Sequence, residues 1–154
     1  MEEEKSFAAF LRGINISGKN KIPMTELKKG FEKLGLEGVK TYLNSGNVVF
    51  SSEELEDILQ HAPDWWGDEN KDIYDNLIFI LPPLTFTDVL REIGEPKEGL
   101  ERVMDYKNAV FWSFVRKDYQ KTNWWSKTAS SDIAGKLTIR TANTVRKTAG
   151  AFSR

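Results

Sequence analysis

The order in which apolar strand-like segments and helical segments alternate is the feature that most constrains the fold of this chain. From residue 76 onward the pattern predicts strand, helix, strand, strand, helix and strand, followed by a closing helix. This is the β-α-β-β-α-β order of a ferredoxin-like domain. Residues 5–61 repeat the order without its last strand. We therefore expect an α+β protein of two ferredoxin-like (βαββαβ) subdomains with antiparallel sheets, the first incomplete, although periodicity alone leaves other α+β topologies open.

The boundaries of these segments follow from periodicity and turn residues. Asn44-Ser45-Gly46-Asn47 predicts one hairpin turn and Lys107-Asn108 another. The expected strands are residues 7–11, 39–43, 48–51, 76–81, 102–106, 109–115 and 136–140, and the expected helices are residues 24–34, 53–61, 87–93, 118–125 and 143–149. The predicted division is residues 1–61 for the first subdomain, and residues 62–154 for the second subdomain with its C-terminal helix.

The chain contains no cysteine among its 154 residues, which excludes disulfides, thiolate zinc sites and cysteine nucleophiles. Its acidic start, Met1-Glu2-Glu3-Glu4, is not the basic end of a signal peptide. The longest apolar run, residues 77–84, contains Pro82 and Pro83 and is too short to span a bilayer. We therefore expect a cytoplasmic protein.

Charge is unevenly distributed along the chain. Residues 53–101 carry three basic and fourteen acidic side chains, whereas residues 102–154 carry eleven basic and three acidic ones. Such asymmetry indicates either a face that binds polyanions or two segments that neutralise each other on folding.

The loop between the first strand and the first helix is the leading candidate site. Glycines allow close backbone approach there, and basic and amide side chains offer donors before a helix N-terminus, as an anion such as phosphate or carboxylate requires. The candidate residues are Arg12, Gly13, Asn15, Gly18, Asn20 and Lys21. Neither a Walker motif nor a dinucleotide fingerprint has this spacing. The alternative is an ordered loop whose side chains satisfy buried backbone groups.

Two further polar groups are weaker candidates for the same ligand. Asn44, Ser45 and Asn47 are most simply turn residues, but their side chains could face the first loop across the sheet end. Arg140 and Asn143 stand at another junction between a strand and a helix, where Asn143 or Thr141 would serve as the helix N-cap.

An aromatic and basic segment, residues 111–127, raises the alternative of a nucleic-acid-binding module. Rings among cations on a ferredoxin-like sheet resemble RNA-binding surfaces. However, the ribonucleoprotein strand motif is absent, and alternation places Trp112 and Phe114 on the opposite face from Phe111, so that one of these faces must be core.

Catalytic and metal-binding patterns are scarce. His61, the single histidine, ends an acidic helix without an obvious nucleophile beside it. The acidic residues between Asp64 and Asp75 lack the pattern of a calcium loop and predict a solvated loop, which Trp65-Trp66 would anchor by burying their rings. We expect no metal and no cofactor.

Several motifs, in matching order along the chain, resemble an uncharacterised bacterial family, domain-of-unknown-function family 1697 (DUF1697). They are residues 11–18 (LRGINISG), 20–24 (NKIPM), 41–50 (TYLNSGNVVF), 63–67 (PDWWG) and 137–140 (LTIR). The resemblance implies two ferredoxin-like subdomains and implies no activity. The family usually has a further helix and strand near Ser52-Glu53, and an Asn-Trp pair where this chain has Thr141-Ala142.

Three hypotheses for function follow. The leading one is a small ligand- or anion-binding domain, the second is a nucleic-acid-binding module that uses the C-terminal third, and the third is an enzyme that acts on an anionic small molecule. No membrane partner is expected, and the sequence predicts no oligomeric state.

Overall fold

The structure is a computed structural model that describes residues 8–11, 21–42, 47–49 and 53–150. Contacts within the chain divide it into two units. The first comprises Met1–Leu59 and Arg146–Arg154, and the second comprises Gln60–Val145. Each unit has its own sheet, and each is described by itself below.

The first unit contains a three-stranded antiparallel sheet. Its elements are β1 (Ala8–Phe10), α1 (Met24–Lys33), β2 (Lys40–Tyr42), β3 (Asn47–Val49) and α2 (Glu53–Gln60). The strand order is β1-β3-β2, with Val48 of β3 opposite Ala9 of β1 and Thr41 of β2. After α1, Gly35 adopts a φ of 86°, a conformation that glycine adopts without strain. The strand and helix order is the predicted one.

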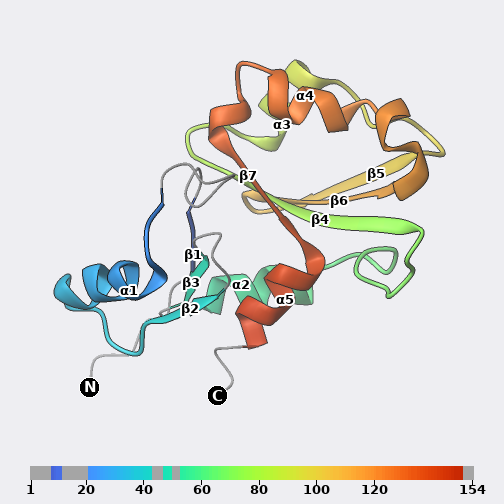
Figure 1. Ribbon diagram of the computed structural model, residues 1–154. Helices are drawn as coiled ribbons and strands as arrows, with labels where there is room; N and C mark the ends of the chain where they lie inside the picture. Colours follow the sequence, from blue (N-terminus) through green and yellow to red (C-terminus); the bar gives the residue numbers. More distant parts are fainter. Residues whose placement is uncertain (1–7, 12–20, 43–46, 50–52, 151–154) are drawn as a thin grey trace. The chain divides into compact units, whose positions relative to one another are not determined.

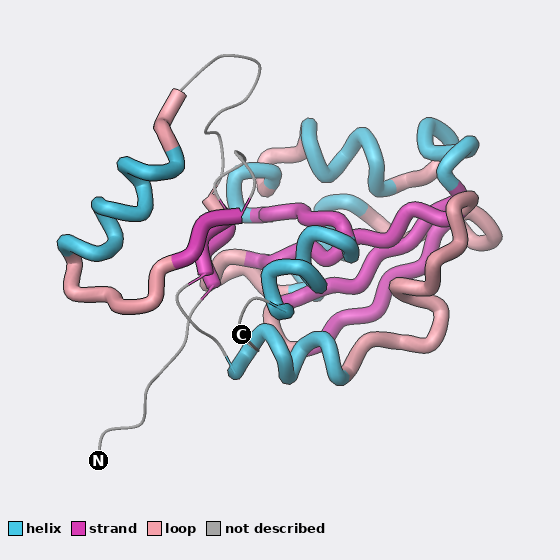
Figure 2. The backbone as a smooth tube through the Cα atoms, turned by 60° about the horizontal axis from the view of Figure 1, so that its bottom comes forward, coloured by secondary structure: helices cyan, strands magenta, loops and turns pink. Residues whose placement is uncertain are grey.

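The second unit contains a four-stranded antiparallel sheet (Figures 1 and 2). Its elements are β4 (Ile73–Ile80), α3 (Phe86–Ile93), β5 (Glu101–Tyr106), β6 (Ala109–Val115), the 3-10 helix η1 (Arg116–Lys121), α4 (Trp124–Ser130), the 3-10 helix η2 (Ala134–Lys136), β7 (Leu137–Thr141) and the start of α5 (Ala142–Gly150). The strand order is β5-β6-β4-β7. The predicted α+β class is thereby confirmed.

Both faces of this sheet are covered. α3 and α4 lie over one face (Figure 1), where the core residues Ile78, Val89, Ile93, Trp112 and Trp124 are at most 1% exposed. Side chains that point to the opposite face, Leu77 and Phe111, are also fully buried. Because both faces are covered, Trp112 and Phe111 are both core residues. The alternation in the sequence required only that one of the two faces be buried.

Two predicted boundaries are wrong. Residues 118–125 do not form one helix: η1 ends at Lys121, and α4 begins at Trp124. Between them the Thr122 backbone is extended, and its hydroxyl donates to the Tyr119 carbonyl at 2.7 Å and accepts from the Trp125 N–H at 3.3 Å. A threonine that offers the backbone these local bonds competes with a continuous helix. β4 also begins at Ile73, three residues before the predicted start.

A capping box begins α3. The Asp88 N–H donates to the Thr85 hydroxyl at 3.3 Å, and the Thr85 N–H and hydroxyl both donate to the Asp88 carboxylate at 2.9 Å. The bond from the Thr85 backbone, followed by the bond from its hydroxyl, lowers the pKa of Asp88 below its ordinary value. The ionised form of Asp88 is therefore the one that stabilises the fold.

Replacement of Asp88 by asparagine is expected to lower the melting temperature at neutral pH. Because the pKa of Asp88 is lower in the folded state, its stabilising contribution is present above the ordinary aspartate pKa of about 4 and is lost as the pH falls through the folded value. The difference between wild type and Asp88→Asn should therefore shrink on acidification. Glu92→Gln, an exposed carboxylate on the same helix, controls for general loss of charge. A difference that grows at low pH would contradict the assignment.

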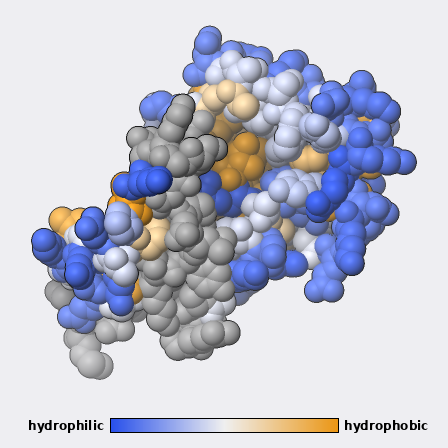
Figure 3. All heavy atoms as spheres, in the orientation of Figure 1, coloured by the Kyte–Doolittle hydropathy of each residue, from blue (hydrophilic) through white to orange (hydrophobic). Residues whose placement is uncertain are grey.

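Hydrophilic residues predominate on the face shown in Figure 3. Leu34, Leu81 and Trp125 are the large hydrophobic side chains of the described residues with the greatest exposure, at 78%, 47% and 42%. No helix among the described residues combines the length and hydropathy needed to cross a membrane.

Candidate functional site

Most of the predicted first loop lies outside the described residues. The loop residues outside the description are Arg12, Gly13, Asn15, Gly18 and Asn20, and the turn residues Asn44 and Ser45 lie outside it as well. The anion site that these residues would form stays a prediction. Lys21 is described and exposed, and Asn47 begins β3.

At the junction of β7 and α5, the structure favours the capping interpretation. The Thr144 N–H donates to the Thr141 hydroxyl at 3.3 Å, so Thr141 acts as the N-cap of α5. Arg140 donates to the Ile139 carbonyl at 2.9 Å, and Asn143 is exposed. A ligand-binding role for Arg140 and Asn143 stays a prediction.

A row of polar side chains crosses three strands on the face of the second sheet that lies opposite α3 and α4. Ser113 of β6 is paired directly with Arg102 of β5 on one side and with Asp75 of β4 on the other. The Ser113 hydroxyl donates a hydrogen bond to the Asp75 carboxylate, and both residues are at least nine-tenths buried. Residues two positions away on β4 and β6, Ile73, Leu77, Phe111 and Val115, are apolar. We call Arg102, Ser113 and Asp75 the polar row.

The sequence pattern does not predict the polar row. Asp75 was expected in a solvated acidic loop, but it lies within β4 and is 9% exposed. That prediction is wrong because β4 extends three residues toward the N-terminus. A signal was present in β6, since Ser113 is the one polar residue in an otherwise apolar strand (AVFWSFV).

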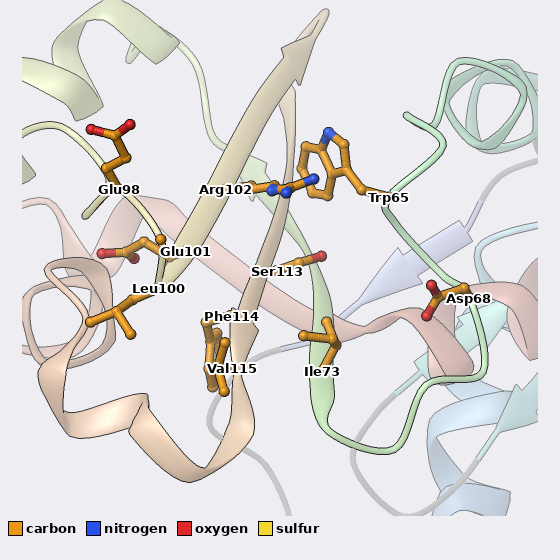
Figure 4. A pocket seen from close by; sticks show the side chains of 11 residues that line it. Trp65, Asp68, Ile73, Glu98, Leu100, Glu101, Arg102, Ser113, Phe114 and Val115 are labelled. Carbon is orange, nitrogen blue, oxygen red and sulfur yellow. The ribbon is translucent and has the colours of Figure 1, made fainter.

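A groove of about 590 Å³ opens above one part of this row, at the end of the sheet where β4 and β5 begin and β6 ends (Figure 4). The polar row contributes Arg102 and Ser113, and the walls come from the loop before β4 and the turn before β5. The lining residues are Trp65, Asp68, Ile73, Glu98, Gly99, Leu100, Glu101, Arg102, Ser113, Phe114 and Val115. We call this the sheet-end groove.

The tryptophan pair fixes one wall of the groove. Trp66 is 4% exposed, its Nε1–H donates to the Asn76 carbonyl at 2.7 Å, and its ring meets the Phe111 ring edge-on at 5.0 Å. This confirms that Trp66 anchors the loop. Trp65 is only half-buried, and Figure 4 shows its indole and the Arg102 side chain extending toward one another.

Hydrogen bonds within the loop place Asp68 at the rim. Its Oδ1 accepts from the Asn70 N–H at 3.1 Å, and the Asn70 side chain accepts from the Asp72 N–H at 3.0 Å. The second Asp68 carboxylate oxygen takes no part in this turn. The described structure thus presents an exposed carboxylate at a defined position beside the groove.

Glu101 holds the opposite wall. Its buried carboxylate accepts hydrogen bonds from the Trp112 indole at 3.1 Å and from the backbone N–H groups of Lys97 (2.9 Å), Asn123 and Trp124 (3.3 Å). One side chain therefore joins the turn before β5 to the start of α4. Since its oxygens are occupied, Glu101 shapes the groove without offering a free acceptor.

The aromatic and basic segment places its rings in the core. Phe111, Trp112, Phe114 and Trp124 are at most 3% exposed, so they are unavailable for base stacking in this structure. Trp125 is more exposed than these four rings, at 42%, and it makes T-shaped contacts with Phe114 and Tyr119. Nucleic-acid binding through the basic side chains stays a prediction.

His61 is exposed and stacks on Tyr106, with ring centroids 4.0 Å apart and planes inclined by 8°. It does not line the sheet-end groove. Among the described residues, no group of three or more His, Asp or Glu side chains is arranged to hold a metal ion.

The chain is similar to known proteins whose descriptions name no activity. Residues 5–54 match the family described as "Protein of unknown function (DUF1697)". None of the curated proteins matches the chain. Among solved structures, the conserved bacterial protein SP0830 from Streptococcus pneumoniae is similar, with a TM-score of 0.82 and 26% identity over 96% of this chain and 98% of that chain. The resemblance expected from the motifs is thereby confirmed: the chain carries the DUF1697 match in its first third and shares its overall fold with a conserved bacterial protein.

Proposed function

We propose that this protein is a cytoplasmic small-ligand-binding domain and that its site within the described residues is the sheet-end groove. The observation that carries the proposal is the polar row beneath the groove. At the groove this row places the exposed guanidinium of Arg102 directly beside the Ser113 hydroxyl, whose hydrogen is held by the buried Asp75 carboxylate. A charged donor next to an acceptor of fixed orientation is an arrangement that favours a role in binding.

The state of Arg102 supports the same proposal. It is exposed at the groove and takes part in no hydrogen bond or ion pair with another described residue. An arginine presents five N–H donors in a fixed plane, which suits recognition of ligand oxygens. The groove volume of about 590 Å³ lies within the range of roughly 300–1,000 Å³ that is usual for small-molecule sites.

The geometry favours binding over catalysis. The Ser113 hydroxyl donates to the Asp75 carboxylate, but a serine nucleophile also needs a base that is oriented by a third group. The usual base is histidine, and His61 stacks on Tyr106 outside the groove lining. The enzymatic alternative would therefore have to use another base.

We also propose a ferredoxin-like topology for both units and an anion-binding site in the loop before α1. The strand orders β1-β3-β2 and β5-β6-β4-β7, all antiparallel, support two ferredoxin-like units, since the second order places the strands as 2-3-1-4 within its unit. The loop at residues 12–21 would be a second, anion-binding site, supported by its glycines and basic residues.

One experiment separates the two sites. Inorganic phosphate, D-glucose, L-glutamate and L-lysine are titrated against the full chain, and binding is followed by amide chemical shifts in NMR. If the groove is the site, the double variant Trp65→Ala/Arg102→Gln loses binding of whichever probe binds the wild-type chain. The double variant Arg12→Ala/Lys21→Ala retains that binding. The reverse result assigns the site to the first loop. Binding that both pairs leave unchanged contradicts both assignments.

A further inference from the structure

We infer that the sheet-end groove takes a neutral, polyhydroxylated ring, such as a monosaccharide or the sugar of a larger neutral ligand. This rests on the proposed function, because it names the chemistry of the ligand for the same groove. Three properties of the lining carry the inference: its mixed charge, its balance of donors and acceptors, and its half-buried indole.

The charge of the lining disfavours a simple ion of either sign. Figure 4 shows the carboxylates of Glu98 and Asp68 on opposite sides of the groove, with Arg102 between them. An anion drawn to Arg102 would meet two exposed carboxylates, and a cation drawn to either carboxylate would approach the guanidinium. A neutral ligand avoids both repulsions.

The hydrogen-bonding groups of the lining complement hydroxyls. Arg102 can only donate, and the carboxylates of Asp68 and Glu98 can only accept. The Ser113 hydroxyl has already given its hydrogen to Asp75, which leaves its oxygen as an acceptor. A ligand must therefore donate to several oxygens and accept from one guanidinium. Hydroxyl groups do both, whereas a phosphate or carboxylate would leave the lining oxygens without donors.

Trp65 supplies a surface for the ring itself. It is half-buried, it lines the groove, and it carries no hydrogen bond to another described residue. The face of an indole is electron-rich and attracts weakly positive C–H groups, such as those on one face of a sugar ring. Ile73 and Val115 add apolar surface at the end of the groove away from Trp65 (Figure 4).

The test compares matched probes on the full chain by isothermal titration and amide chemical shifts. The probes are D-glucose, D-galactose, D-ribose, a glucose phosphate, L-glutamate and spermidine. We expect at least one neutral sugar to bind, and the glucose phosphate to bind about tenfold more weakly than the best of them, a difference of about 1.4 kcal/mol.

Variants tie this binding to the groove. Trp65→Ala and Arg102→Gln should each weaken sugar binding about tenfold or more, whereas Trp65→Phe, which keeps an aromatic face, should retain most of it. Asp68→Asn should also weaken sugar binding, because it replaces a carboxylate acceptor. Asparagine preserves the turn to Asn70, so the loop itself should be unchanged. Arg91→Gln, an exposed arginine on α3 outside the lining, is the matched control and should leave binding unchanged.

Three outcomes would overturn the inference, and they differ in what they leave standing. Tighter binding of the glucose phosphate, glutamate or spermidine at the groove rejects a neutral sugar but keeps the proposed ligand-binding function. Sugar binding that Trp65→Ala, Arg102→Gln and Asp68→Asn all leave intact rejects the groove as the site. If no probe binds, and the amide spectrum of the wild-type chain stays the same on addition of each probe, both the inference and the proposed function are rejected.

Discussion

Replacement of Glu101 by glutamine is expected to destabilise the second unit by about 3 kcal/mol, because the buried carboxylate accepts four N–H hydrogen bonds and bonds to charged acceptors contribute about 1.5–3 kcal/mol each. The amide of glutamine keeps one acceptor oxygen, but its NH₂ group would face donors that now point at a carboxylate oxygen. The turn before β5 and the first turn of α4 should loosen together, since Glu101 joins them.

Urea unfolding followed by tryptophan fluorescence measures this effect, because Trp112 and Trp124 both donate to Glu101. Glu98→Gln is the matched control: it makes the same chemical change three residues earlier on an exposed side chain and should alter stability by less than about 0.5 kcal/mol. Equal effects of the two substitutions would show that the hydrogen bonds to Glu101 do not stabilise the fold.

Trp124→Ala is expected to cost about 3–5 kcal/mol, as is usual for removal of a fully buried tryptophan. The Trp124 ring is 0% exposed, lies 6.3 Å from the Trp112 ring, and donates through Nε1 to the Gly94 carbonyl at 3.0 Å. The substitution would leave a cavity in the core and would remove the donor of the partly buried Gly94 carbonyl.

The neighbouring residue provides an internal control for this prediction. Trp125→Ala makes the same change one position later in α4. Because both variants gain the same helix propensity, this gain cancels when their stabilities are compared. Trp125 is 42% exposed, and its loss should cost about 1 kcal/mol. Thermal unfolding of the two variants checks the difference, and similar melting temperatures would contradict the burial assigned to Trp124.

Local features of the chain could be predicted from the sequence. The hairpin between β5 and β6 turns at Lys107-Asn108, as expected, and Lys107 adopts a positive φ of 53°. The anchoring role of Trp66 was also foreseen, because a large ring in a polar loop is commonly buried. The turn depends on residues that are adjacent in the sequence, and the burial of Trp66 follows from the size of its ring, so neither prediction required knowledge of the strand pairing.

The candidate groove could not be predicted, because it depends on non-local pairing. Ser113 meets Asp75 across 38 positions of sequence, and only the register of β4 against β6 brings them together. A shift of one residue would have turned Asp75 to the other face. Likewise, the sequence places Trp124 beside Trp125 but gives no sign of which ring enters the core, since the start of α4 depends on Thr122.

The position of β5 at the edge of the four-stranded sheet has a consequence for self-association. An edge strand presents unpaired backbone groups to which a second chain can add, and charged side chains on such a strand oppose this addition. β5 carries the exposed charges of Arg102 and Asp105, with Lys107 directly after it. The charge of Arg102 therefore opposes strand addition at this edge, and replacing it with an apolar residue would create a surface suited to strand-to-strand aggregation.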